Sequence, residues 1–317
     1  MTNIVFMGTP AFAAPILEGI IENGYNVLAV VTQPDRPVGR KRVLHASPVK
    51  EVALKYGIKV FQPVKLSGSD EMQEIIDLQP DLIVTAAYGQ FLPTKLIESA
   101  KIAAINVHGS ILPKYRGGAP IQRAIINGDK ETGITIMYMA KKMDAGDIIK
   151  ISKIPILDTD NQDTVFSKLS ILGSEMINDV ISDIANNKVT PIKQNEEEVT
   201  FAYNLTKEDE LINFHKTATE VFNQIRGLNS NPGGHFTLDG INIKVYNSKV
   251  SLKHTDFKEG TIVDINKDSF DVACKDGTVI SILELKVPSK NKMFVRDFMN
   301  GQGKNMIVKG KVINQGE

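Results

Sequence analysis

The chain has 317 residues, of which 42% are hydrophobic and 23% charged, and its formal net charge at pH 7 is zero. This length suffices for about two domains of roughly 150 residues each, and the zero charge means that binding to nucleic acid needs a local basic patch. The single cysteine, Cys274, excludes an internal disulfide and a zinc site built from several cysteines.

The chain carries no sign of an export signal or a membrane span. Residues 1–7 contain no Lys or Arg, which a signal peptide needs at its start, and no apolar run is long enough to cross a bilayer. Because cysteine is also scarce, we expect a cytoplasmic protein that contacts no membrane. We expect it to act as a monomer.

Apolar strands and helices alternate through the first half of the chain. The expected strands cover residues 3–8, 27–32, 58–61, 81–89, 102–108 and 133–139. The expected helices cover residues 10–23, 47–57, 70–79, 93–99, 119–127 and 162–186. This alternation predicts an α/β domain with a Rossmann-like, open, mostly parallel sheet and helices on both faces. In such sheets, ligands bind beyond the carboxyl ends of the strands.

The character of the sequence changes after residue 190. The segment 193–204, KQNEEEVTFAYN, is polar and acidic, as is typical of a linker. A helical stretch near 207–225 is followed by short alternating strands with hairpin signals at Asp239-Gly240 and Asp276-Gly277. These features predict a smaller C-terminal β-barrel of the OB-like type. We therefore divide the chain into a catalytic domain, 1–190, a linker, 191–204, and a C-terminal domain, 205–317.

The end of the strand 102–108 carries the first candidates for chemistry. Asn106 and His108 are two residues apart, so on a strand their side chains point to one face while Val107 points to the other. A carboxamide and an imidazole together offer donors for a developing oxyanion and a group that exchanges protons near neutral pH. On these two residues alone, a strand end that only hydrogen-bonds its own turn is the commoner arrangement.

A third candidate is Asp144, which begins the tight turn Asp144-Ala145-Gly146 after the strand 133–139. If that strand is parallel to its neighbours, the turn can lie at the same sheet edge as Asn106 and His108. The carboxylate would then orient the imidazole or relay a proton through water. The alternative is an ordinary solvated aspartate in a turn.

Two stretches are locally basic. The long loop 33–50 holds five positive residues against one negative, a balance of plus four: Arg36, Arg40, Lys41, Arg42 and Lys50 against Asp35. The tail from Lys286 to Lys311 holds seven positive residues against Asp297, a balance of plus six. Either stretch suits a phosphate backbone, and either is equally explained by an ordinary charged surface.

The N-terminal loop argues against nucleotide cofactors. The segment 8–15, GTPAFAAP, has one glycine where a dinucleotide site needs three, and Pro10 occupies the turn. The chain also contains no phosphate-binding Walker A motif. Hydride transfer with a nicotinamide cofactor is therefore poorly supported.

Several longer motifs occur in an order that resembles one enzyme family. They are FMGTPAFA, VVTQPDRPVGRKR, SPVK, INVHGSILPKYRGGAPIQ, ETGITIMYM, KKMDAGDII, NLTKEDELINF and QIRGLN. Together they span nearly the whole chain and resemble the bacterial methionyl-tRNA formyltransferases, within the folate-dependent formyltransferases. One departure is the segment SNPGG at 230–234, where that family commonly has a Pro-Trp-Pro-like segment, since this chain has no Trp.

The resemblance implies a reaction. The formyl group of 10-formyltetrahydrofolate passes to the α-amino group of methionine that is esterified to initiator tRNA. The folate acts as a formyl-donating co-substrate, and no metal is required. Asn106, His108 and Asp144 match the family's catalytic trio. Asn106 and His108 would donate hydrogen bonds to the oxyanion, while His108 and Asp144 would handle the protons.

The resemblance also implies binding sites. The family's folate-binding stretch is matched by Ser110, Ile111, Leu112 and Pro113. The segment that approaches the tRNA acceptor end is matched by Arg40, Lys41 and Arg42, and the C-terminal barrel matches a second tRNA-binding domain. The alternatives are a formyltransferase for a small amine, such as glycinamide ribonucleotide or an amino sugar, and a catalytically silent RNA-binding protein. The two basic stretches argue against the first alternative, and the intact trio argues against the second.

Overall fold

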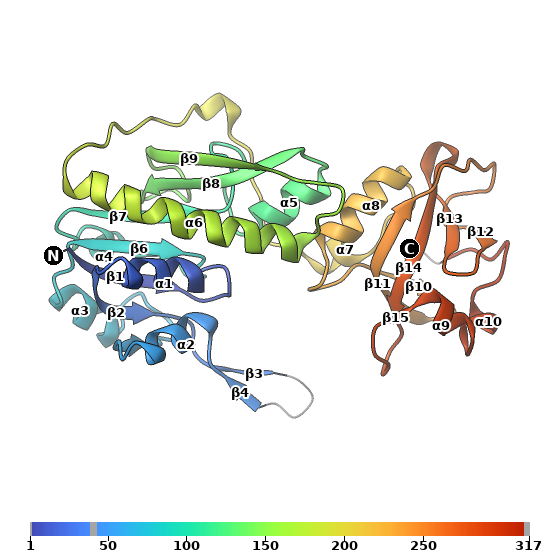
Figure 1. Cartoon of the computed structure of the whole chain (residues 1–317), viewed down its shortest axis with the longest axis horizontal. Coiled ribbons are helices and arrows are strands. Elements are labelled where there is room, and N and C mark those ends of the chain that lie inside the picture. Colours follow the sequence, from blue (N-terminus) through green and yellow to red (C-terminus); the bar gives the residue numbers. More distant parts are fainter. Residues whose placement is uncertain (1, 39–42, 314–317) are drawn as a thin grey trace. The chain divides into compact units, whose positions relative to one another are not determined.

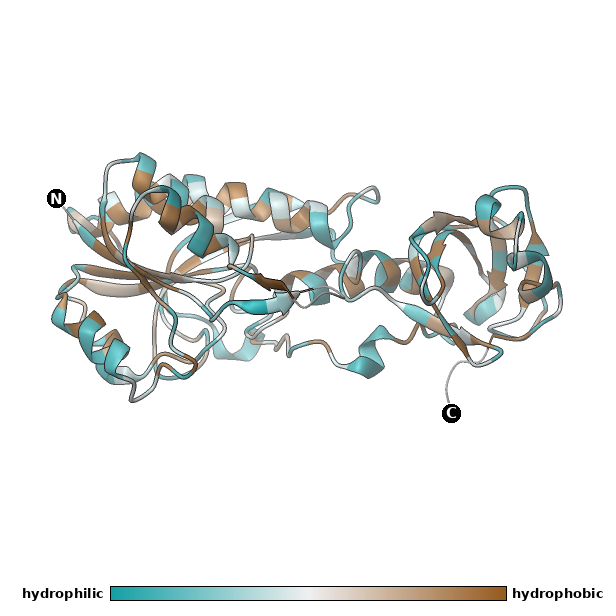
Figure 2. Ribbon diagram, turned by 90° about the horizontal axis from the view of Figure 1, so that it is seen from below, coloured by the Kyte–Doolittle hydropathy of each residue, from teal (hydrophilic) through white to brown (hydrophobic). Residues whose placement is uncertain are grey.

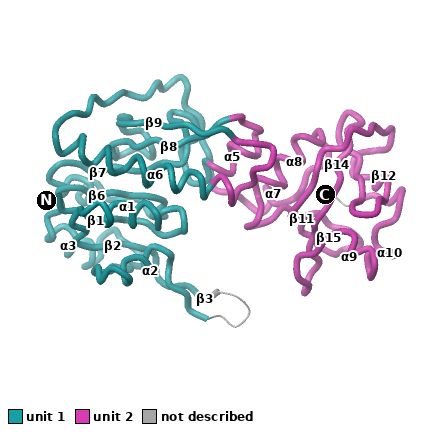
Figure 3. The backbone as a smooth tube through the Cα atoms, in the orientation of Figure 1, with its two compact units in different colours: residues 1–120, 131–155, 166–203 teal, residues 121–130, 156–165, 204–317 magenta. Residues whose placement is uncertain are grey.

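A computed structural model describes residues 2–38 and 43–313 of the chain. The chain forms two compact units (Figure 3). Unit 1 comprises residues 1–120, 131–155 and 166–203, and unit 2 comprises residues 121–130, 156–165 and 204–317. The division at residues 190 and 204 that the sequence suggests stays a prediction.

Unit 1 contains a seven-stranded sheet with the strand order β5-β2-β1-β6-β7-β8-β9 (Figure 1). In that order the strands are Val60–Phe61, Asn26–Val31, Asn3–Gly8, Leu82–Ala86, Ala103–His108, Glu131–Tyr138 and Ile148–Pro155. The first five strands pair in parallel, which confirms the predicted Rossmann-like, mostly parallel sheet. The parallel arrangement considered for the strand near 133–139 is wrong, because β8 runs antiparallel to β7 and to β9.

Helices cover both faces of this sheet. They are α1 (Ala14–Glu22), α2 (Pro48–Lys55), α3 (Asp70–Asp77), α4 (Thr94–Ile97) and α6 (Gln162–Ala185), whose first four residues are grouped with unit 2. On one face, Gly173 of α6 approaches Val107 and Ile16 so closely that a Cβ atom would lie 3.2 and 3.1 Å from their side chains. On the other face, residues of α3 and α4 share an apolar cluster with Val5 and Met7.

Local sequence explains where these helices begin and which side they bury. The hydroxyl groups of Ser47 and Ser69 accept hydrogen bonds from the backbone N–H groups of the first turns of α2 and α3. In Figure 2 the strands of unit 1 are coloured mostly as hydrophobic, whereas α6 alternates between hydrophobic and hydrophilic residues. Buried strands and amphipathic helices are the pattern that the sequence predicts.

The segment 33–50 is not simply the long loop that we expected. Arg36–Val38 and Val43–His45 form β3 and β4, an antiparallel two-stranded hairpin. Val43 and Leu44 are 52% and 67% exposed, so apolar burial within unit 1 does not explain this hairpin. Three of the predicted site residues, Arg40, Lys41 and Arg42, fall between the two strands in sequence and lie outside the described residues.

Unit 2 is built on a curled antiparallel sheet with the strand order β10-β11-β14-β13-β12, and β15 pairs with β14. These strands are His235–Leu238, Ile241–Val250, Val279–Lys286, Phe270–Ala273, Ile262–Ile265 and Met293–Phe294. Asp239 and Gly240, at φ 50° and 75°, form the predicted turn between β10 and β11. The predicted smaller β domain is thereby confirmed.

Short helices complete unit 2. They are α5 (Pro120–Ile126), α7 (Lys207–Glu210), α8 (Ala218–Gly227), α9 (Val295–Met299) and α10 (Gly303–Met306). The single helical stretch expected near 207–225 is two helices, because Thr206 and Thr217 each begin a new helix with a capping box. Phe236 packs edge-on against both Phe214 and Phe270 at the centre of this unit's core.

Candidate active site

The structure brings Asn106, His108 and Asp144 together. Nδ2 of Asn106 donates a hydrogen bond to Oδ1 of Asp144 across 3.5 Å. Nδ1 of His108 lies 3.7 Å from Oδ2 of the same carboxylate. The side chains of His108 and Asp144 are only 6% and 13% exposed, so water screens their interaction weakly. The trio thus forms one nearly buried polar cluster beside the end of β7.

Asp144 reaches this cluster by a route that the sequence did not reveal. After β8, the backbone N–H of Met139 donates to the carbonyl of Ala104, so the chain leaves the strand beside the start of β7. The loop must then return to Asn106. It turns tightly at Asp144, which has φ 50°, and at Gly146, where a Cβ atom would lie 1.7 Å from the Tyr138 carbonyl oxygen. Gly146 is therefore required for this turn.

The Asp144 side chain is held in place rather than solvated. Its Oδ2 atom accepts a hydrogen bond of 2.9 Å from the backbone N–H of Gly117, in addition to its contacts with Asn106 and His108. A carboxylate that is fixed by a backbone donor keeps one position, so it can orient the groups beside it. This placement argues against the alternative of an ordinary exposed turn residue.

The imidazole of His108 is oriented by a backbone carbonyl. Its Nε2 atom lies 3.0 Å from the carbonyl oxygen of Tyr115. Because a carbonyl oxygen only accepts, Nε2 carries a hydrogen, and Nδ1 is the atom that faces Asp144. The 3.7 Å between Nδ1 and the carboxylate is longer than a hydrogen bond.

Sequence reasoning missed Thr85, which orients Asn106. Thr85 pairs with Asn106 across β6 and β7, and its hydroxyl donates a hydrogen bond of 2.7 Å to Oδ1 of Asn106. The oxygen of the carboxamide is thereby engaged, and the Nδ2 side faces the cluster. The only signal in the sequence was one hydroxyl in the otherwise apolar run 82–86. That signal says nothing of the partner strand.

The stretch predicted to bind folate lies directly after β7. Ser110 and Leu112 are buried, and their polar groups are satisfied internally. The Ser110 hydroxyl donates to the Lys114 carbonyl, and the Thr135 hydroxyl joins the Ser110 carbonyl to the Leu112 N–H. Ile111 and Pro113 are half-buried, so they present some surface to a ligand. Folate binding by these four residues stays a prediction.

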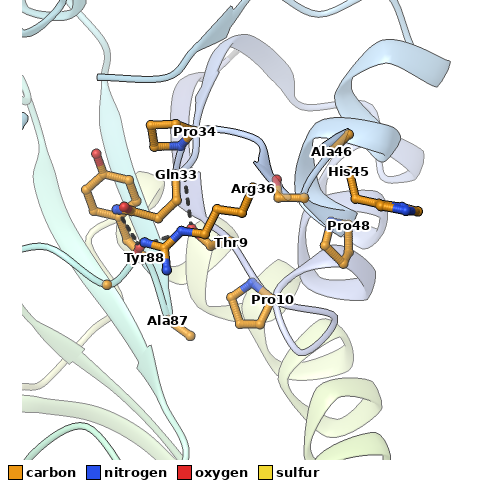
Figure 4. Close-up of a pocket in the computed structure, with 12 residues that line it drawn as sticks. Thr9, Pro10, Gln33, Pro34, Arg36, His45, Ala46, Pro48, Ala87 and Tyr88 are labelled. Carbon is orange, nitrogen blue, oxygen red and sulfur yellow. Dashed lines mark hydrogen bonds between the residues drawn. The ribbon is translucent and has the colours of Figure 1, made fainter. Parts of the chain in front are cut away.

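A pocket of about 420 Å³ opens at the carboxyl ends of β1, β2 and β6 (Figure 4). The order of connections reverses between β1 and β6, which is where open α/β sheets commonly bind ligands. The hydroxyl of Thr9 and the amide of Gln33 both donate to the Tyr88 carbonyl, which fixes the pocket wall. Arg36 extends toward Tyr88, whereas His45 points away. None of the trio lines this pocket.

The segment 192–202, here called the strap, was expected to be part of a linker but is bound to unit 1. Ile192 and Ile148 exchange two backbone hydrogen bonds, of 2.7 and 2.8 Å. Further along, the Arg116 backbone donates to the Thr200 carbonyl and accepts from the Ala202 N–H. The strap therefore runs beside both loops that contact the trio, and its acidic composition gave no hint of this.

The described residues hold neither a cluster of metal ligands nor a membrane-spanning helix. Within residues 2–38 and 43–313, no three His, Cys, Asp or Glu side chains are arranged to hold a metal ion. In the same part of the chain, no helix is both long enough and apolar enough to cross a membrane.

Comparison with known protein families gives two matches, one in the N-terminal and one in the C-terminal part of the chain. Residues 2–181 match the model described as "Formyl transferase", and residues 204–303 match "Formyl transferase, C-terminal domain". The methionyl-tRNA formyltransferase of Ligilactobacillus salivarius is 59% identical over 318 residues and covers all of both chains. That of Enterococcus faecalis is 52% identical and covers 98% of this chain and 100% of its own.

Solved structures of lower identity share the fold. The sugar 3N-formyl transferase WlaRD, crystallised with dTDP and 5-N-formyl-THF, has a TM-score of 0.68 at 20% identity, covering 92% of this chain and 99% of its own. HypX from Aquifex aeolicus, in complex with tetrahydrofolic acid, has a TM-score of 0.66 at 14% identity, covering 100% of this chain and 51% of its own. At these identities the likeness concerns the fold alone.

Proposed function

This chain belongs to the formyl transferase family, and from that premise we propose that it formylates the methionine carried by initiator tRNA. The formyl donor is 10-formyltetrahydrofolate, and the acceptor is the α-amino group of the methionyl ester. One observation carries this assignment: the 59% identity to a methionyl-tRNA formyltransferase extends over the full length of both chains, including the C-terminal domain. The sugar formyltransferase WlaRD, at 20% identity, offers a likeness of fold only.

The amine attacks the formyl carbon, and the carbonyl oxygen becomes a tetrahedral oxyanion. Asn106 is the donor proposed to stabilise that oxyanion, because Thr85 occupies its oxygen and leaves Nδ2 as the group that faces the cluster. A preorganised donor of this kind stabilises the transition state more than the substrate. Collapse of the intermediate then breaks the bond to N10 of the folate.

His108 and Asp144 are proposed to handle the proton. The amine must lose a proton as it forms the new bond, and N10 must gain one as it leaves. Nδ1 of His108 is the exchangeable position, since Nε2 is committed to the Tyr115 carbonyl. The Asp144 carboxylate, 3.7 Å away, stabilises the imidazolium that forms when Nδ1 takes the proton. A protonated Nδ1 is also a second donor for the oxyanion.

Contact with the tRNA is assigned to both units. Arg40, Lys41 and Arg42 follow β3 in sequence, and Arg36 of that strand lines the pocket beside Thr9 and Tyr88. We therefore place the acceptor end of the tRNA on the side of the hairpin and the pocket. Monomeric action in the cytoplasm belongs to the same proposal.

The basic tail of unit 2 is less positive than its count suggests. Lys292 pairs with Glu284, Arg296 lies near Asp268 and Asp297, and Lys311 pairs with Asp239. Three of the seven positive side chains in this tail therefore have carboxylate partners. We still assign tRNA binding to this domain, with a smaller electrostatic share than the bare count implies.

The test is formyl transfer from 10-formyltetrahydrofolate with methionyl initiator tRNA, free methionine and glycinamide ribonucleotide as competing acceptors. We expect transfer to the charged tRNA alone. Arg42→Ala should weaken tRNA use and reduce its dependence on salt. The matched control is Lys101→Ala, which removes an exposed positive charge just before β7. This residue lies at the end of β7 that is away from Asn106 and His108. Transfer to a small amine, indifferent to Arg42, would overturn the tRNA assignment.

A further inference from the structure

One side chain of the strap is bound to the turn that carries Asp144. Nε2 of Gln194 donates two hydrogen bonds of 2.8 Å, to the carbonyl oxygens of Asp144 and Gly146. Its Oε1 atom accepts from Nε and Nη2 of Arg116, at 3.0 and 2.9 Å. Both the nitrogen and the oxygen of the carboxamide are therefore hydrogen-bonded to protein groups. A glutamine without a structural role would bind water at these atoms instead.

Arg116, the second partner of Gln194, lies between two residues that touch the trio. The carbonyl of Tyr115 binds His108, and the N–H of Gly117 binds Asp144. The Arg116 side chain is only 4% exposed, and Glu196 of the strap supplies its counter-charge at 2.8 Å. Gln194 thus joins the loop that holds His108 to the turn that holds Asp144.

The turn at Asp144 depends on such support. Asp144 has φ 50°, a left-handed backbone conformation that is uncommon outside glycine, although aspartate tolerates it better than most residues. The carbonyls of Asp144 and Gly146 converge on one donor, so removal of that donor frees both of them to rotate toward water. Such rotation would carry the carboxylate away from Asn106 and His108, whose present separations of 3.5 and 3.7 Å tolerate little movement.

We infer that Gln194 is a positioning residue for formyl transfer: its carboxamide nitrogen holds the turn 144–146, so that Asp144 stays beside Asn106 and His108. The inference rests on the proposed function, because its main readout is the transfer rate. The hydrogen bonds of Gln194 reach the backbone of Asp144 and Gly146 rather than the side chains of the trio, so it acts on the backbone that carries Asp144.

The first test compares three variants by kcat, by KM for both substrates and by melting temperature. Gln194→Ala should lower kcat by about tenfold to a hundredfold, the size expected when a catalytic group is displaced by about 1 Å. Both KM values should change by less than about threefold. Gln194→Glu keeps an acceptor for Arg116 but turns an oxygen toward two carbonyl oxygens, so its kcat should be at least as low. The control, Glu197→Gln, alters an exposed side chain of the strap and should match the wild type.

The decisive test is a double-mutant cycle with Asp144→Ala, measured in single turnovers with enzyme in excess. If Gln194 acts through Asp144, the substitution Gln194→Ala causes no further loss of rate in the Asp144→Ala background. The inference would be overturned if Gln194→Ala lowered the rate by the same factor in the wild-type and in the Asp144→Ala background. It would also be overturned if kcat were unchanged in Gln194→Ala and Gln194→Glu.

A readout without activity separates this inference from the proposed function. Hydrogen exchange at the Gly117 amide, which Asp144 holds at 2.9 Å, should become faster in Gln194→Ala and stay unchanged in Glu197→Gln. A wild-type enzyme that formylates no charged tRNA would refute the proposed function, and the exchange rate would still decide whether Gln194 holds the turn. Unchanged exchange in Gln194→Ala would overturn the inference whatever the activity.

Discussion

The end of β7 and the strap both serve the same cluster, yet the sequence describes them very differently. β7 is a buried apolar strand whose last residues include two polar side chains on one face, Asn106 and His108. The strap has three consecutive glutamates and is mostly exposed, as a solvated linker would be. Nevertheless Gln194 of the strap binds the backbone of Asp144 and Gly146, which lie 50 and 48 residues away in the chain.

This difference separates the groups proposed to perform the chemistry from the groups that hold them. A functional side chain at the end of an apolar strand interrupts a regular pattern, so local periodicity reveals it. A supporting side chain such as Gln194 obeys no period, because its partners are set by how distant segments meet in the fold. We therefore expect substitutions at β7 to abolish chemistry, and substitutions in supporting positions to reduce it in proportion to the contacts they remove.

A large effect is expected for Asn106→Ala. Loss of the donor proposed to face the oxyanion should lower kcat by about a hundredfold to a thousandfold, while folate affinity changes little. Equilibrium binding of the folate and steady-state kinetics measure the two quantities separately. A loss of folate affinity with an unchanged rate per bound complex would contradict the role given to Asn106.

A smaller effect is expected for Thr85, which orients Asn106 and is given no direct role in the proposed reaction. Thr85→Val removes the hydroxyl that donates to Oδ1 of Asn106 at nearly constant volume. One such hydrogen bond contributes about 1 kcal/mol, so kcat should fall by about five- to tenfold. Thr85→Ser keeps the hydroxyl and is the matched control, and equal losses in both variants would show that packing, not the hydrogen bond, matters here.

Glu196, an exposed residue of the strap, should contribute least to the rate. Its hydrogen bond with Arg116 lowers the pKa of the Glu196 carboxyl. The ion pair is therefore intact above the ordinary carboxyl pKa and is lost only as the pH falls through the lowered value. Because 68% of the Glu196 side chain is exposed, Glu196→Gln should change kcat by less than about twofold between about pH 6 and pH 8. A larger loss would mean that the strap depends on this charge.

An ion pair in unit 2 serves as a reference for the site variants, because its removal should lower the stability of the protein without changing the rate of formyl transfer. Nη1 and Nη2 of Arg123 both donate to the Asp209 carboxylate, at 2.8 and 2.7 Å. The Arg123 hydrogen bond lowers the pKa of Asp209 below its ordinary value of 3.8. The stabilisation of unit 2 by this ion pair is therefore complete when the pH lies above 3.8. It is lost as the pH falls through the lowered pKa of Asp209.

The variant Asp209→Asn should consequently reduce the free energy of unfolding by about 1 kcal/mol at pH 7, with kcat unchanged. Urea denaturation at pH 7 measures the first quantity. The wild type and the variant should become equally stable when the pH falls below the lowered pKa. A difference that persists at that acidity would show that Asp209 stabilises unit 2 by something other than its charge.

The sequence predicted most of the fold because its signals are local. Strand and helix alternation, the serine caps of α2 and α3, and the Asp239-Gly240 turn each depend on residues close in the chain. The antiparallel direction of β8 could not be seen, since an apolar strand looks the same in either direction. The hairpin β3–β4 was also missed, because Pro34, just before β3, and Pro37, within it, are residues typical of turns and loops.

The three candidate side chains of the site were predictable from the sequence, whereas the residues that hold them were not. Asn106 and His108 were placed on one face by the period of a strand, and the structure keeps them there. Asp144 was expected at the same site for a reason that proved wrong, since it arrives by a returning loop after an antiparallel strand. Thr85 and Gln194 act through contacts between distant segments, for which single-sequence patterns carry no information.

The most direct test of the account is the rate of the chemical step in single turnovers, with methionyl initiator tRNA and 10-formyltetrahydrofolate both saturating, for the wild type and for Asp144→Asn. Asp144→Asn keeps the shape of the side chain but removes the charge proposed to stabilise the His108 imidazolium. The account predicts a rate lower by about 10² to 10⁴, with the affinities for folate and tRNA preserved. A variant that transfers the formyl group at the wild-type rate would contradict the proposed roles of His108 and Asp144.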